Sequence, residues 1–295
     1  MINAPNVQEW LSGIGLVYWV VALIAAGFAW KLTVRRSTKI ISAMLILGFF
    51  LYWPVSDMVR NTMERSAFTK RYEAAAARFA ERCKIAGDRI VRTVVDVDGI
   101  AILKMRTTKD KGYGIDQFAP SAAFYHESTE EFYLNSFLWF EEDNRKGVER
   151  GRLNTSPTAF RGYQYLDYVD PTDGKPYRYR MVARPDGGNS GGREYVTVRS
   201  SAADDKSRYG VTFEDIVDPG DREHWIAGSI VKIVDLQTSQ EIARHTRFAF
   251  DSQLGSRAAH RTPWASPEYC PSFQRSGAIK TRHFVDQVLI PRREG

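Results

Sequence analysis

Two long apolar runs dominate the first 55 residues of the chain. The first extends from Trp10 to Trp30 and holds no charged residue across 21 positions. A helix of about 20 such residues crosses a hydrocarbon core of about 30 Å. The second run, Ile40 to Val55, is shorter and completes a span only if the aliphatic part of Lys39 lies along its start. The pattern predicts a transmembrane helical hairpin in residues 1–55, with spans at about 10–30 and 38–55.

Each run has an alternative interpretation. The first could be a cleaved signal peptide, but the preceding segment has no Lys or Arg and carries Glu9. The second could be the buried helix of a soluble core, because its length is marginal for a span. Two runs of this kind in succession favour the hairpin over either alternative.

Helical periodicity continues after the second run, over residues 56–87. Apolar or small residues recur there at helical spacing: Met58, Met63, Phe68, Tyr72, Phe79 and Cys83. Gly87 is placed to end the helix. The sequence therefore predicts a membrane-proximal helix over 56–87 that emerges directly from the second span.

From residue 88 to 295 the pattern changes to short alternating segments. We expect three β-hairpins: one turning at Asp98-Gly99, one within 163–179 and one within 226–250. Residues 129–140 fit a helix better than a strand, residues 185–193 read as a Gly-rich loop, and residues 282–290 fit a strand or a helix. The fold class expected for 88–295 is α+β, with an antiparallel sheet and flanking helices.

The connection between the two apolar runs is basic. Residues 31–39 hold four bases and no acid: Lys31, Arg35, Arg36 and Lys39. Short basic loops stay in the cytoplasm. We therefore expect a bacterial inner-membrane protein with a cytoplasmic loop and with both termini and the large domain in the periplasm.

The cysteines agree with an oxidising compartment. Cys83 and Cys270 both lie in the expected periplasmic part, where a disulfide between them is permitted. Two unpaired thiols, one of them buried, are the alternative. We favour the disulfide because two cysteines allow one intramolecular pairing.

Charge and composition exclude some function classes. The net charge is +6, of which residues 1–55 contribute +3 (four bases, one acid) and the remainder +3 (37 bases, 34 acids). A domain this mildly basic is not typical of nucleic-acid binding. Neither a CxxC pair nor a Cys/His cluster indicates zinc, and the sequence predicts no cofactor and no small-molecule ligand.

Two short motifs carry weak chemical signals. The segment 188–192, Gly-Asn-Ser-Gly-Gly, superficially resembles the nucleophile loop of chymotrypsin-like serine proteases, but Asn189 stands where that family has Asp, and His126 lacks the expected context. The segment 221–225 places Glu223 beside His224, a pair capable of acid–base work or metal ligation. A Gly-rich turn and a surface cap with ion pairs explain these two segments more simply.

Four tyrosines form the candidate partner surface. Tyr163 and Tyr165, like Tyr177 and Tyr179, lie two residues apart, so each pair is expected to share a strand face. Packing within the sheet is the simpler role for them. If they are exposed, Tyr beside Arg suits a protein-binding surface.

One stretch also carries a family resemblance. Residues 71–100, from Arg-Tyr-Glu-Ala-Ala-Ala-Ala to Val-Asp-Gly-Ile, resemble a group of uncharacterised proteobacterial envelope proteins, and the similarity extends to 169–179, 208–216 and 221–229. Such proteins are similar to accessory and immunity proteins of secreted antibacterial lipase effectors. The resemblance implies a protein partner in the periplasm and transfers no catalytic residue.

Three functions follow as hypotheses. The first is a membrane-anchored periplasmic protein-binding module, an immunity or accessory protein that covers a secreted effector. The second is a structural or assembly subunit of an envelope complex, which would also interact through its membrane helices. The third is an envelope hydrolase that uses Glu223 and His224.

Overall fold

The structure is a computed structural model of the whole chain. It describes residues 7–32, 36–106, 119, 122–124, 130–138, 162–183, 195–202, 205–258, 261, 263–264, 266–272 and 277–292. The chain divides into two compact units, residues 1–70 and residues 71–295.

The first unit consists of helix α1 (Val7–Leu32) and most of helix α2 (Arg36–Lys84). The two helices touch where the Tyr18 hydroxyl donates a hydrogen bond of 2.6 Å to the Phe50 carbonyl, with ring centroids 5.3 Å apart. In the described part of the chain, one helix is long and apolar enough to cross a membrane, and it is α2. No residue of its apolar window is buried inside the protein.

Helix α2 confirms the helix expected over 56–87 and its continuity with the second apolar run. It passes through Pro54 without ending and stops at Lys84, three residues before the expected Gly87. Of the four bases predicted to orient the hairpin, Lys31 lies in the last turn of α1, Arg36 opens α2 and Lys39 follows in α2. Arg35 lies outside the described residues.

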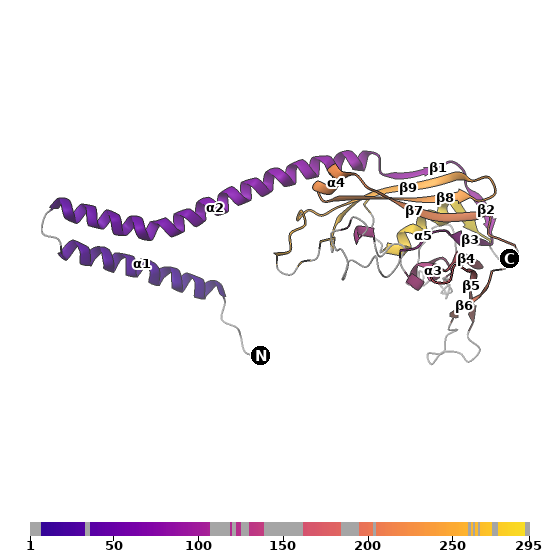
Figure 1. The fold of residues 1–295 in the computed structure, drawn as a ribbon, viewed down its shortest axis with the longest axis horizontal. Coiled ribbons are helices and arrows are strands. Elements are labelled where there is room, and N and C mark those ends of the chain that lie inside the picture. The colour runs from indigo at the N-terminus through magenta and orange to yellow at the C-terminus, as the bar shows by residue number, and fades with distance from the viewer. Residues whose placement is uncertain are drawn as a thin grey trace, which may run out of the picture. The chain divides into compact units, whose positions relative to one another are not determined.

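The second unit is an α+β domain built on a mixed sheet (Figure 1). Its strands are β1 (Gly87–Ile90), β2 (Val94–Val97), β3 (Gly99–Ile102), β4 (Tyr165–Val169), β5 (Pro176–Ala183), β6 (Tyr195–Ser201), β7 (Tyr209–Ile216), β8 (Ile226–Asp235), β9 (Gln240–Phe250), β10 (Glu268–Cys270) and β11 (Leu289–Pro291). Its further helices are α3 (Glu130–Leu138), α4 (Pro219–Glu223) and α5 (Gly277–Val288). The large sheet has the order β1-β9-β8-β7-β3-β4-β5-β6, with β10 also on β9, and β11 pairs separately with β2.

The expectation of a purely antiparallel sheet was wrong at β3. This strand runs parallel to both of its neighbours, β4 and β7, whereas β4–β5, β5–β6, β7–β8 and β8–β9 are antiparallel. The predicted hairpin at Asp98-Gly99 was also wrong, because β2 pairs with the C-terminal β11 instead of β3. A Cβ on Gly99 would lie 2.3 Å from the Tyr165 ring, so this glycine makes room for a neighbouring strand's side chain.

Other local predictions are confirmed. The segments within 163–179 and 226–250 form the antiparallel pairs β4–β5 and β8–β9. The favoured helix within 129–140 is α3, and residues 282–290 contain both candidate structures, the end of α5 followed by β11. The expected loop at 185–193 lies outside the described residues.

The two faces of the large sheet are covered by different helices. Along β8, Val231 and Ile233 point to the main core, which includes residues of α3 and α5 such as Phe137 and Val285. Ile226 points to the opposite face, where the C-terminal end of α2 packs. Side chains alternate along a strand, so this period-two pattern places α2 and the α3–α5 pair on opposite sides of β8 and β9.

Candidate functional site

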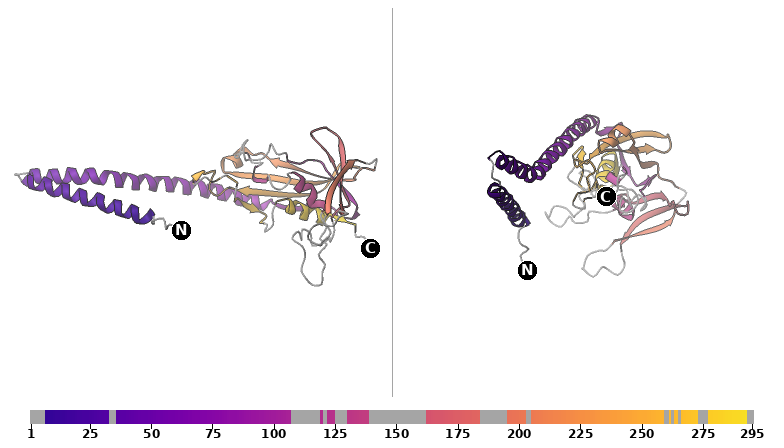
Figure 2. Two further views of the ribbon diagram at one scale, coloured as in Figure 1. Left: turned by 90° about the horizontal axis from the view of Figure 1, so that it is seen from below. Right: turned by 60° about the vertical axis from the view of Figure 1, so that its left-hand side comes forward.

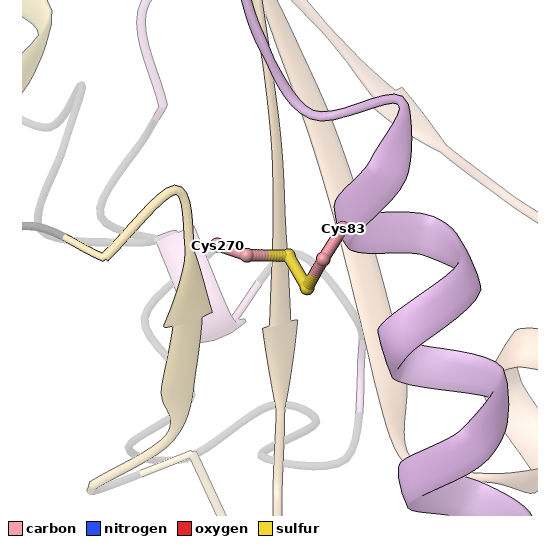
Figure 3. The surroundings of a disulfide bond; sticks show 2 residues. All are labelled: Cys83 and Cys270. Atoms are coloured by element: carbon pink, nitrogen blue, oxygen red, sulfur yellow. A yellow bond between two sulfur atoms is a disulfide. The ribbon is translucent and has the colours of Figure 1, made fainter.

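The C-terminal end of α2 is joined covalently to the sheet. Cys83, in its last turn, forms a disulfide with Cys270 at the end of β10, with the two Cα atoms 5.4 Å apart (Figure 3). The bond joins positions 187 residues apart in sequence. The disulfide predicted from the sequence is therefore present in the structure.

Apolar packing supports the same junction. Ala75 is fully buried against Ile226, Phe248 and Phe250 of the sheet. The Phe250 ring lies 5.3 Å from the Phe79 ring of α2, centroid to centroid. Burying side chains of this size contributes about 1.5–3 kcal/mol each, so the contact holds this end of α2 independently of the disulfide.

Two arginines on the last turns of α2 add an ion-pair network. The Nε of Arg78 donates to Asp221 at 2.6 Å and its Nη2 donates to Asp218 at 2.9 Å. Arg82 donates to the same two carboxylates, at 3.0 Å to Asp221 and 2.7 Å to Asp218. Asp218 also accepts a hydrogen bond from the Asp221 backbone as the N-cap of α4. This bond and the two arginines lower the pKa of Asp218.

The four tyrosines of the predicted partner surface do not share one face. Tyr163 precedes β4, is buried, and donates its hydroxyl to the Leu289 carbonyl at 2.6 Å. Leu166, the residue after Tyr165 in β4, belongs to the core and pairs with Tyr179 of β5. Tyr179 therefore lies on the core side of the sheet, and so does Tyr177, two residues earlier. Tyr177 and Tyr179 thus share one face of β5, as their spacing predicts, whereas Tyr163 lies outside the strand that carries Tyr165. Because side chains alternate along a strand, Tyr165 lies on the opposite face from Tyr177 and Tyr179, so the four side chains do not form one surface.

Strands β4, β5 and β6 form one end of the large sheet (Figure 2). Tyr165 lies on the face of these strands that points away from the core, which we call the outer face. Part of this face is occupied by Arg178, whose guanidinium lies 3.8 Å from the centre of the Tyr165 ring. The guanidinium also donates to both carboxylate oxygens of Asp167, at 2.7 and 3.0 Å. Burial raises the pKa of Asp167, but the bonds from Arg178 and Ser207 outweigh it and the net shift is downward.

The remainder of this outer face is open. Val169, Val182 and Val198 are 55%, 39% and 41% exposed, and the exposed Arg180 of β5 pairs with Val198 of β6. Val182 and Val198 lie near Arg180 and Tyr165 and make a mixed surface of the kind that protein interfaces use, whereas Val169 lies on the far side of the Asp167–Arg178 pair. We name the four neighbouring residues (Tyr165, Arg180, Val182 and Val198) the β4–β6 outer surface.

The side chains of Glu223 and His224, the predicted acid–base pair, have different surroundings. Glu223 ends α4 and its side chain is exposed, while His224 Nδ1 lies 2.7 Å from the Gly220 carbonyl oxygen. A carbonyl only accepts, so Nδ1 carries the proton and the ring is held as a helix C-cap. The protease-like loop 188–192 and His126 lie outside the described residues.

A buried polar row that the sequence did not reveal crosses the core face of the sheet. Asp215, Ser229 and Arg247 stand opposite one another on β7, β8 and β9. Arg106 reaches the same row and donates to both oxygens of Asp215, at 2.9 and 2.5 Å. Burial lowers the pKa of Arg247 to about 9, and the charge of Arg106 lowers it in the same direction.

Three buried polar atoms in this region have no hydrogen-bond partner among the described residues: Arg106 Nε, Ser229 Oγ and Trp264 Nε1. Such atoms bind water or an oxygen acceptor where space allows. Charged residues in a strand are normally expected to face solvent, which is why the sequence did not predict the row.

No group of three His, Cys, Asp or Glu residues in the described part of the chain could hold a metal ion. Comparison of the chain with protein-family models, with curated proteins and with solved structures finds no match.

Proposed function

We propose that the protein is a membrane-anchored envelope protein whose domain, residues 71–295, binds a protein partner on the outer side of a bacterial inner membrane. The observation that carries the proposal is the make-up of α2. Its N-terminal part has an apolar window with no buried residue, and its C-terminal end is fastened to the sheet by the Cys83–Cys270 disulfide. An exposed apolar helix needs a nonaqueous environment, and a disulfide persists in an oxidising one.

In this proposal α1 and α2 form a transmembrane hairpin. The contact between Tyr18 and Phe50 supports the pairing of two apolar helices. The basic residues between them favour a cytoplasmic loop, so both ends and the domain lie in the periplasm. A cysteine bridge in the domain is compatible with that side of the membrane.

The partner is a protein, and the β4–β6 outer surface binds it. The resemblance to accessory and immunity proteins suggests a secreted effector, which such a domain would inactivate by covering its active site. Exposed valines supply apolar contact area, and Arg180 supplies a charge at the rim.

Topology is tested with two fusions to alkaline phosphatase, one after residue 295 and one within the 33–35 connection. The enzyme folds only in the periplasm, so activity is expected from the first fusion alone. Activity from the second fusion but not the first would reverse the topology.

Binding is tested by crosslinking in intact cells, followed by purification of the tagged full chain in detergent and mass spectrometry. A single stoichiometric effector is expected, and co-expression should protect a sensitive strain. Val182→Asp and Arg180→Glu should weaken recovery of the effector, whereas Val217→Asp, a change at a valine that is 80% exposed beyond β7, should not. Recovery of a set of envelope-machine components without an effector would favour an assembly subunit instead.

A further inference from the structure

Strand β6 stands last in the strand order of the large sheet, and among the described strands it pairs with β5 alone, which leaves its other edge without a strand partner there. All seven of its residues pair with β5 without a shift, and its sequence, Tyr-Val-Thr-Val-Arg-Ser-Ser, has neither Pro nor Lys. Natural edge strands are usually short, bulged or charged, because a regular edge pairs readily with another strand.

The opposite edge has the usual protection. Strand β1 has four residues, two of which are Asp88 and Arg89, and it shares its neighbour β9 with β10. The contrast indicates that β6 is the edge from which this sheet can be extended.

One backbone hydrogen bond fixes which groups of β6 face outward. The Ala202 N–H donates to the Pro176 carbonyl at 3.1 Å. Hydrogen-bonded and non-bonded pairs alternate in an antiparallel ladder, so residues 196, 198 and 200 bond to β5. On the other side of β5, the Asp170 N–H donates to the Lys175 carbonyl at 3.0 Å. The odd-numbered residues of β5 therefore bond to β4 and its even-numbered residues bond to β6, which agrees with the assignment for β6. The N–H and C=O groups of residues 195, 197, 199 and 201 therefore point to the open edge.

We infer that this edge pairs with β6 of a second copy of the chain, antiparallel and with Val198 on the two-fold axis. In this arrangement the outward-facing residues 195 and 197 meet 201 and 199 of the partner strand. All seven residues overlap, and about eight backbone hydrogen bonds form across the axis. The inference does not depend on the proposed function.

The side chains suit this pairing. Arg199 is the one charged residue of β6, and its guanidinium is held by Asp170 at 2.9 Å. It would stand opposite Thr197 of the partner strand, so two like charges do not meet. On the outer face Val198 would contact its own copy, and the neighbouring Val182 would extend the apolar strip on each side of the axis. Both valines are more than a third exposed in the single chain. A C2 pairing of this kind is also the commonest form of homodimer.

The test uses cysteine substitutions in the full chain, purified in detergent and mildly oxidised. A residue on the two-fold axis of an antiparallel pair lies about 4.5 Å from its copy, Cα to Cα, within reach of a disulfide. Val198→Cys is therefore expected to give a covalent dimer on a non-reducing gel. Val196→Cys is the matched control on the same face, because it would face Ser200 and lie roughly 13 Å from its own copy. It should stay monomeric on the gel.

A second variant measures the association itself. Val198→Lys places two like charges on the axis and should raise the dimer dissociation constant at least about tenfold in light-scattering measurements. Val217→Lys should leave that constant unchanged. A wild-type chain that is monomeric, or equal crosslinking at 196 and 198, would overturn the inference. Circular dichroism of each variant verifies that the domain is folded.

Discussion

Removal of the Cys83–Cys270 bridge should weaken the domain by an amount set by the length of chain that it closes. The two cysteines are 187 residues apart. The loop-entropy relation assigns a bridge of this length about 5 kcal/mol at 25 °C, because the unfolded chain is constrained by it. Native bridges typically contribute about 2–5 kcal/mol. We expect Cys83→Ala combined with Cys270→Ala to lower the free energy of unfolding by about 3–5 kcal/mol.

The assay is urea unfolding of the full chain in detergent, followed by near-ultraviolet circular dichroism of the buried aromatic rings. With a slope of about 2–3 kcal/mol per molar urea, the loss corresponds to a fall in the midpoint of roughly 1–2.5 M. The junction between α2 and the sheet keeps its apolar and ionic contacts in the variant, so the folded spectrum should be unchanged before urea is added.

Reductant supplies the control. The wild-type chain in reductant should unfold at the midpoint of the double variant, and the double variant should not respond to reductant at all. A midpoint within about 0.3 M of the oxidised wild type would refute the reasoning. It would mean that the bridge does not form or that the unfolded chain is already constrained by residual structure.

The remaining predictions concern packing and charge. Phe250→Ala removes a fully buried ring from the contact with α2 and should cost about 3–5 kcal/mol in the same urea assay; a loss under about 1 kcal/mol would contradict that contact. Gly99→Ala places a Cβ against the Tyr165 ring and should cost about 1–3 kcal/mol, whereas no loss would mean that the ring can move aside. A hydrogen bond from Arg208 helps to lower the pKa of Asp235 from 3.8 to about 2. Stability that this carboxylate contributes above about pH 4 should therefore fall as the pH drops towards 2, and an Asp235→Asn variant should lose stability less steeply over that interval. Equal slopes for the two proteins would contradict the ion pair.

Local signals in the sequence predicted the elements that depend on local interactions. The pairs β4–β5 and β8–β9 each join strands that are neighbours in the chain, so a turn and two alternating runs suffice to predict them. The first part of helix α2 follows from an apolar run and the part after residue 56 from helical periodicity. The α+β class follows from the same segments, because most strands follow one another through turns and do not alternate regularly with helices.

The pairing of β3 could not be predicted in this way. Asp98-Gly99 is a strong hairpin signal, yet the N–H of Gln164 donates to the Asp98 carbonyl at 2.7 Å, and β3 then continues parallel to β4. Partners far along the chain supply this pairing, and nothing in the local pattern encodes them. The glycine is explained by the Tyr165 ring that packs over it.

The sequence also did not predict which charged residues are buried. Arg178 and Arg106 are 2% and 4% exposed, each held by both oxygens of a carboxylate. Charged residues are mostly exposed, so a strand that contains Arg is normally read as having a solvent-facing side there. A carboxylate on a neighbouring strand allows such an arginine to be buried, but that carboxylate can be identified only when the strand order is known.

Helix α2 combines two kinds of side-chain pattern in one element. Between Ile40 and Val55 it is apolar on every side, which no single protein surface could cover. From residue 71 to Lys84 its apolar residues are confined to a stripe on the sheet, and Arg78 and Arg82, four residues apart, lie together beside that stripe and pair with Asp218 and Asp221. The change from an all-round to a one-sided apolar pattern within an unbroken helix shows that only its C-terminal part is patterned to pack on the sheet, and it supports the proposal that the first part lies in a membrane.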